Sequence, residues 1–130
     1  LKAFKNIHSK LAKGGLLALE VWHGPAVEFQ KPEVRYKTVF GDFGEIARIA
    51  IPTEISRERV DVTYHIFHSE KDSDTYKKYS EVHSLSPSYS DQIAQLASLS
   101  GFEILTSQEF MTSNTPSRDT WSVLYLLRAT

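Results

Sequence analysis

The chain has 130 residues, of which 41% are hydrophobic and 24% charged, with no cysteine and a formal net charge of −1. This apolar content excludes a wholly disordered chain and suits one domain, while the lack of cysteine excludes disulfides and fits a cytoplasmic protein. The near-neutral charge argues against binding to nucleic acid or an anionic membrane, and no apolar run is long enough to span a bilayer.

The first predicted elements are a helix and a strand joined by two glycines. Apolar residues recur every three to four positions in residues 1–11, which predicts a helix with one apolar face. Gly14 can end this helix in a left-handed conformation, and the apolar run 16–22 is typical of a strand buried inside a parallel sheet. Because the helix begins at Leu1 without an N-cap, we expect the natural polypeptide to extend upstream.

The middle of the chain changes to strand-like alternation after a loop predicted at 26–33. Charged residues or Gly and Pro separate four such stretches, and a polar hairpin loop is expected at 69–74. We therefore predict an antiparallel meander of three or four strands, at residues 34–40, 46–51, 60–68 and 76–85.

A helix and two strands are predicted to close the chain. Ser88 and Asp91 have the spacing of a capping box, and Gly101 can end the helix that follows. The strands are expected at 102–110 and 120–128, with a polar turn between them.

The motifs at both ends resemble the C-terminal half of a class I S-adenosylmethionine-dependent methyltransferase. Residues 11–17, L-A-K-G-G-L-L, are similar to the L-x-P-G-G-x-L lead into the fifth strand, with Lys13 in place of Pro. Residues 99–104, L-S-G-F-E-I, are similar to the A-G-F-x-V before the sixth strand, and residues 120–128 resemble the closing antiparallel strand. The resemblance covers nearly the whole chain.

This resemblance implies an α/β fold: half of a Rossmann-like methyltransferase, with an antiparallel meander insertion and a closing antiparallel strand pair. Residues 1–130 would form one domain. Its parts would be a helix and the central strand (1–25), the antiparallel insertion (26–86), and a last helix with two strands (87–130). Glu20-Val21-Trp22 and Glu81-Val82-His83-Ser84-Leu85 resemble segments of the small-molecule branch that includes amino-sugar N-methyltransferases. Methyl transfer to nitrogen or oxygen of a small molecule is then expected.

The family's glycine-rich D/E-x-G-x-G-x-G loop has no counterpart in these residues. In the family this loop holds S-adenosylmethionine, so the cofactor-binding residues would lie upstream of Leu1. We expect the isolated chain to bind S-adenosylmethionine weakly or not at all, and to be catalytically silent.

Glu20, Trp22 and His23 lie where the first predicted strand ends, which is where open α/β sheets place ligands. We expect Glu20 and Trp22 to contact substrate and His23 to be a catalytic candidate. The alternative is that Trp22 belongs to the core and His23 is a solvated loop residue.

His83 and Arg35 are the candidates in the meander. His83 alternates with Glu81 on one strand face, so a carboxylate beside the imidazole could tune a general base, although an exposed polar pair is the alternative. Arg35 could pair with an anionic substrate group or be a solvated strand residue. The histidines show no metal-ligand spacing, so we expect no metal.

A non-catalytic α+β interaction module remains a rival hypothesis. An antiparallel sheet with a free edge can form a homo-oligomer by edge pairing. Both hypotheses allow such self-association, and only the enzyme requires cofactor binding by the longer natural chain.

Overall fold

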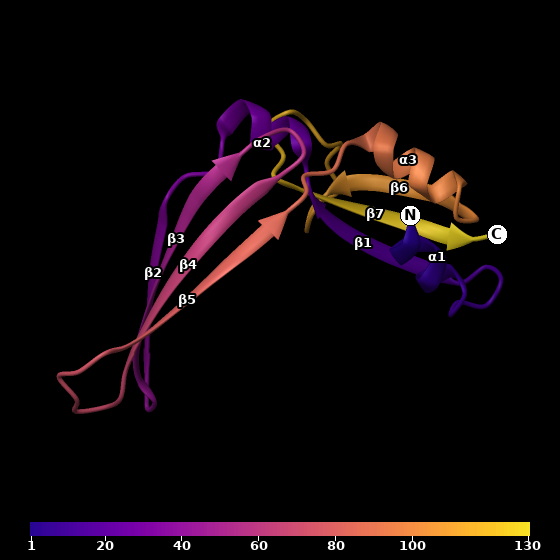
Figure 1. Cartoon of the computed structure of the whole chain (residues 1–130). Coiled ribbons are helices and arrows are strands. Elements are labelled where there is room, and N and C mark those ends of the chain that lie inside the picture. Colours follow the sequence, from indigo (N-terminus) through magenta and orange to yellow (C-terminus); the bar gives the residue numbers. More distant parts are fainter. The chain divides into compact units, whose positions relative to one another are not determined.

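The computed structural model describes residues 1–130 as a mixed α/β chain with two antiparallel sheets (Figure 1). Contacts divide it into two compact units: unit 1 combines Leu1–Gln30 with Pro87–Thr130, and unit 2 is Lys31–Ser86. No helix is long and apolar enough to cross a membrane. The elements in chain order are α1 (Lys2–His8), β1 (Leu16–Trp22), α2 (Gly24–Gln30), β2 (Arg35–Gly41), β3 (Gly44–Ile55), β4 (Val60–Ser69), β5 (Lys77–Leu85), α3 (Ser90–Ser98), β6 (Phe102–Glu109) and β7 (Ser122–Ala129).

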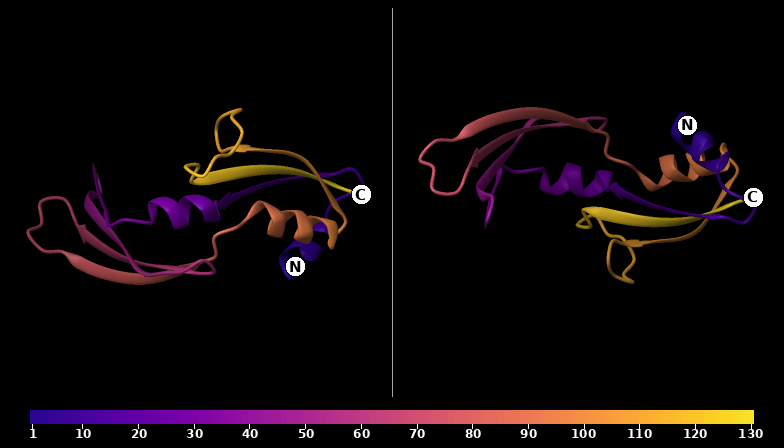
Figure 2. Two further views of the ribbon diagram at one scale, coloured as in Figure 1. Left: turned by 90° about the horizontal axis from the view of Figure 1, so that it is seen from above. Right: turned by 90° about the horizontal axis from the view of Figure 1, so that it is seen from below.

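Unit 1 is built on a three-stranded antiparallel sheet with the order β1-β7-β6. Alternate residues of the central strand β7 are buried, because they face a core to which α1 and α3 contribute. Figure 2 shows α1 and α3 on the same side of this sheet. The buried core residues are Phe4, Ile93, Ala97, Phe102, Val123, Tyr125, Leu127 and Ala129.

The strand predicted at 16–22 is confirmed as β1, but its surroundings differ from the prediction. β1 pairs only with β7, in antiparallel register, and is therefore an edge strand within residues 1–130. Leu17, Leu19 and Val21 pack against the core, whereas Leu16 is 56% exposed. Both alternating sets of residues are mostly apolar, so the sequence alone could not show which face is covered.

Unit 2 is a four-stranded antiparallel sheet with the order β2-β3-β4-β5, which confirms the predicted meander. Its first hairpin turns through Asp42 and Phe43, between the paired residues Gly41 and Gly44. β3 is longer than predicted, because a bulge between Pro52 and Glu54 shifts the register without ending the pairing with β4.

The loop predicted at 26–33 is wrong for residues 26–30, since residues 24–30 form the short helix α2, and is confirmed for residues 31–33. Pro25 lies in its first turn, where the missing N–H leaves no helical hydrogen bond unmade. The helix predicted at 1–11 ends earlier, at His8.

The predicted capping box of Ser88 and Asp91 is also wrong. The N-cap of α3 is Tyr89, whose backbone N–H donates to Oε1 of Gln92 at 3.3 Å. Ser88 instead pairs with the end of β1: its N–H donates to the Trp22 carbonyl, and its carbonyl accepts from the Gly24 N–H, each at 2.9 Å. Tertiary pairing therefore moves the start of the helix.

Acid is expected to weaken unit 2 through Asp61, at the start of β4. Arg59 donates to both carboxylate oxygens of Asp61, from Nε and from Nη2, each at 2.8 Å. These hydrogen bonds hold the pKa of Asp61 below its usual range. Since a lowered folded-state pKa stabilises above the unfolded-state value, this contribution is present at neutral pH and is lost below about pH 4.

The measurement is urea unfolding of the sheet at several pH values, compared between the wild type and Asp61→Asn. We expect the difference in the free energy of unfolding between the two proteins to decrease as the pH falls through the pKa of Asp61. A difference in the free energy of unfolding that stays constant from neutral pH to about pH 2 would contradict the role given to this ion pair.

Candidate functional site

The carboxyl end of β1 is held between two backbone segments of unit 1. The N–H of His23 donates to the Trp121 carbonyl at 2.9 Å, which continues the pairing with the segment before β7. On its other side, His23 forms a parallel bridge with Ser88. The backbone at the end of β1 is therefore fixed from both sides.

His23 is buried rather than solvated, with only 6% of its surface exposed. Its Nδ1 lies 3.1 Å from the Thr120 carbonyl oxygen. A carbonyl only accepts hydrogen bonds, so Nδ1 must carry the proton and donate it. This contact fixes the ring in one orientation.

Glu20 and Trp22 are also bound to the start of β7. The Ser122 hydroxyl donates to Oε1 of Glu20. The Trp22 ring packs edge-on against Trp121, with 6.1 Å between the ring centroids. The structure thus gathers the three site residues predicted on β1 at one end of the three-stranded sheet.

Helix α2 is tied to the loop between β6 and β7 by side chains of its last turn. Trp121 Nε1 donates to Oε1 of Gln30, and Nε2 of Gln30 donates to the Asp119 carbonyl at 3.1 Å. The Arg118 guanidinium lies 4.2 Å from the centroid of the Phe29 ring. These contacts give Arg118, Asp119 and Trp121 a structural role in holding α2.

Tyr89 fills the turn after β1, and sequence reasoning did not single it out for this site. Its hydroxyl donates to Oε1 of Glu28 at 2.6 Å. Its ring lies so close to Gly24 that an added Cβ would sit 2.3 Å from Cζ. The Tyr89 ring therefore fills the space beside this strand-to-helix turn.

The other two predicted residues, Arg35 and His83, belong to unit 2. His83 Nε2 lies 3.0 Å from Oε2 of Glu81, and the two side chains are 51% and 59% exposed. The His83 ring also packs edge-on against Tyr64, with 4.8 Å between centroids. Arg48 holds its guanidinium 5.3 Å from the centroid of the same tyrosine ring.

The strand register places Arg35 on the same face of the sheet as His83, but with two strands between them. Arg35 pairs with Ala50, Ala50 with Tyr64, and Tyr64 neighbours His83 across β4 and β5. His65 lies on the opposite face, where its Nδ1 is 2.9 Å from the Ser80 hydroxyl. No three His, Asp or Glu side chains form a group that could hold a metal ion.

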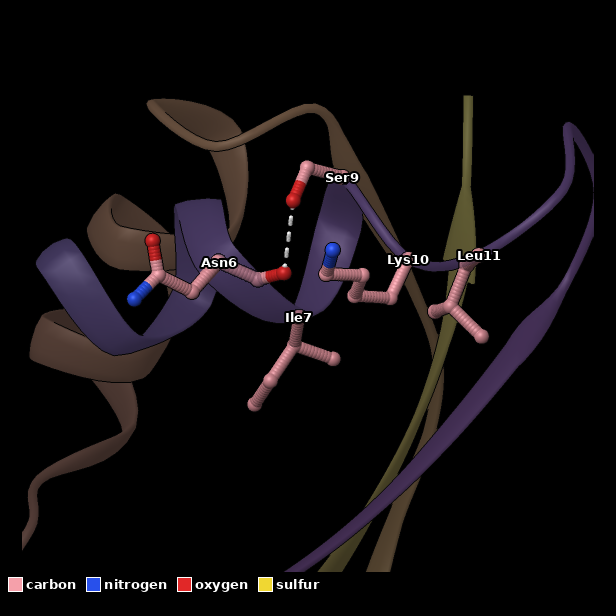
Figure 3. Close-up of a pocket in the computed structure, with 5 residues that line it drawn as sticks. All are labelled: Asn6, Ile7, Ser9, Lys10 and Leu11. Atoms are coloured by element: carbon pink, nitrogen blue, oxygen red, sulfur yellow. Dashed lines mark hydrogen bonds between the residues drawn. The ribbon is translucent and has the colours of Figure 1, made fainter.

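One surface pocket of unit 1 lies away from these residues, at the end of α1 and the segment after it (Figure 3). Within this pocket the Ser9 hydroxyl donates to the Asn6 carbonyl at 2.8 Å. None of the predicted site residues lines this pocket, which is formed by Asn6, Ile7, Ser9, Lys10 and Leu11.

Comparisons with solved structures identify the fold. The chain is similar to an S-adenosylmethionine-dependent methyltransferase from Clostridium acetobutylicum, with a TM-score of 0.78 and 16% identity over 98% of this chain and 50% of that one. It is similar to the sugar N-methyltransferase KedS8 from Streptoalloteichus (TM-score 0.72, 16% identity, 99% of this chain and 48% of that one). It is also similar to CalS10 from Micromonospora echinaspora, an amino pentose methyltransferase (0.68, 17%, 98% and 49%).

The chain thus spans about half the length of the solved structures it matches. No protein-family model and no curated protein matches it. At this level of identity the likeness shows the fold: residues 1–130 have the fold of about half of a methyltransferase, and the predicted C-terminal half fits.

Proposed function

We propose that residues 1–130 form the substrate side of an S-adenosylmethionine-dependent methyltransferase that acts on nitrogen or oxygen of a small molecule. The observation that supports it is the structural match over 98% of the chain to a methyltransferase of which it covers 50%. The edge of β1 away from β7 pairs with no strand and is met only by Ser88 at its carboxyl end. It supports the same proposal, because a Rossmann-like sheet would continue there with a further strand.

In this proposal the end of β1 positions the acceptor molecule. Glu20 and Trp22 contact it through a carboxylate and an aromatic face, both of which suit an amine or a sugar. Arg35 pairs with an anionic group of the substrate, and one of the two candidate histidines, His83 beside Glu81 or His23 at the end of β1, accepts the proton. S-adenosylmethionine supplies the methyl group and is held by residues outside this chain.

A second candidate function is a module that self-associates through the four-stranded sheet. β2 is an edge strand of this sheet and carries the exposed aromatic residues Tyr36 and Phe40, at 68% and 74% exposure. A free apolar edge of this kind can pair with a second copy. This association would be compatible with the enzyme and would not require cofactor binding.

Cofactor binding tests the first proposal. We expect isothermal titration calorimetry to show weak binding or no binding of S-adenosylmethionine to residues 1–130, because these residues contain no glycine-rich D/E-x-G-x-G-x-G loop. A protein extended by the upstream coding sequence is expected to bind S-adenosylmethionine with a micromolar dissociation constant. This corresponds to a binding free energy of about −8 kcal/mol.

The extended protein is then assayed for methyl transfer to amines, amino sugars and alcohols. Binding without transfer to any of these would contradict the proposed substrate class. An extended protein that binds no S-adenosylmethionine, together with sedimentation of residues 1–130 as a dimer, would favour the self-association module instead.

A further inference from the structure

We infer that His23 accepts the proton that the substrate nitrogen or oxygen loses during methyl transfer, and that its Nε2 is the accepting atom. This inference rests on the proposed methyltransferase function. Three observations carry it: the tautomer of the ring, the state of its second nitrogen and the engagement of neighbouring carboxylates.

The tautomer follows from the contact with Thr120. Since Nδ1 donates to the Thr120 carbonyl, the neutral ring holds its proton on Nδ1 and its lone pair on Nε2. A backbone carbonyl orients the ring here in the way that a carboxylate orients the histidine of a hydrolase triad. The ring is thereby prepared to accept a proton at one defined atom.

Nε2 of His23 is free to accept. Nδ1 is the ring nitrogen that makes a hydrogen bond, to Thr120. Nε2 makes no hydrogen bond to the protein and is not among the buried side-chain polar atoms that lack a partner, which are Nε2 of His8 and Oγ of Ser100. Nε2 of His23 therefore keeps some contact with solvent. A mostly buried ring therefore keeps a lone pair within reach of a ligand.

The two carboxylates that flank His23 in the sequence, Glu20 and Glu28, are engaged. Glu20 accepts a hydrogen bond from Ser122, and Glu28 accepts one from Tyr89. His83, the alternative base, is in unit 2 and lies beside Glu81 on an exposed strand face. His23 is the one of the predicted bases that is both buried and fixed by the end of β1.

The proton balance is simple. A lone pair of the substrate nitrogen or oxygen forms the bond to the methyl carbon as the carbon–sulfur bond of the donor breaks, and the sulfur leaves as a neutral thioether. The methylated atom then carries a positive charge and an acidic proton. Nε2 of His23 takes this proton, so the charge passes to the imidazolium ring, which releases the proton to solvent after the product has left.

The tautomer is tested first on residues 1–130, without any assay of activity. Long-range ¹H–¹⁵N NMR of the histidine rings is expected to show His23 protonated at Nδ1 and unprotonated at Nε2 when the ring is neutral. A proton on Nε2 in the neutral ring would overturn the inference.

The role in catalysis is tested in the extended protein with His23→Asn, whose amide N–H can still donate to the Thr120 carbonyl. We expect kcat/KM to fall about 100-fold and the acidic limb of its pH profile to disappear, while S-adenosylmethionine binding stays unchanged. His23→Gln provides a second variant if the first is poorly folded. His65→Asn, which alters a histidine bound to Ser80 in unit 2, is the control and should leave activity unchanged.

The outcomes separate this inference from the proposed function. Methyl transfer that keeps its rate and pH profile in both His23 variants would overturn the role of His23 and leave the methyltransferase standing. A wild-type extended protein that methylates nothing would overturn both, whatever tautomer the NMR spectra show.

Discussion

Replacing Gly44 with alanine is expected to unfold the four-stranded sheet of unit 2. Gly44 follows the two-residue turn between β2 and β3, with a φ of 104° that L-residues rarely adopt. An added Cβ would lie 2.0 Å from the Ser69 carbonyl oxygen and 2.7 Å from backbone atoms of Glu70 and Lys71. Backbone atoms cannot move aside without breaking the pairing of Glu45 with Ser69. Strain and overpacking together predict a loss of about 3 kcal/mol or more.

Gly14→Ala is the matched control, because Gly14 also has a positive φ, of 78°, but nothing lies within 4 Å of the added Cβ. Gly14→Ala should destabilise the protein through backbone strain alone, by about 1 kcal/mol. Hydrogen exchange measured segment by segment is the direct observable. Gly44→Ala should abolish the protection of backbone amides against exchange in β2 to β5 and preserve it in β7. Equal losses of stability in Gly44→Ala and Gly14→Ala would contradict the steric argument.

The order and the type of most elements could be predicted from the sequence, because their periodicity is local. The alternation in residues 60–68 predicts β4 and its two faces, and the strand at 16–22 has the predicted bounds. The short helix α2 could not be predicted in this way. Seven residues that begin with Gly-Pro carry no helical period, and the helix is held by contacts with distant segments such as Tyr89 and Trp121.

The site was predictable in part for the same reason. A strand end is a local feature, so Glu20, Trp22 and His23 could be placed together at the end of β1. The contacts that determine what His23 can do are not local. The Thr120 carbonyl lies 97 positions further along the chain, and Tyr89 lies 61 positions from its partner Glu28. No spacing rule connects such residues, and only the folded sheet brings them together.

Leu127→Ala is expected to cause the second large loss of stability, this time in unit 1. Leu127 is fully buried in the central strand β7 and faces the core formed with α1 and α3. Removing three carbon atoms there loses apolar burial and leaves a cavity, which costs about 3 kcal/mol. Urea unfolding monitored by tryptophan fluorescence measures the loss, since Trp22 and Trp121 both report on unit 1.

Leu126 provides a control that also bears on the proposed function. It is the neighbouring residue on the opposite face of β7, where it pairs with Ala18 and Thr106 and stays partly exposed. In residues 1–130, Leu126→Ala should cost about 1 kcal/mol or less. If a further half of a methyltransferase fold covers this face, the same substitution in the extended protein leaves a buried cavity. It should then lower the free energy of unfolding by about 2 kcal/mol or more. A cost that stays small in both proteins would mean that this face remains open to solvent, and that the sheet is not completed as the proposed function requires.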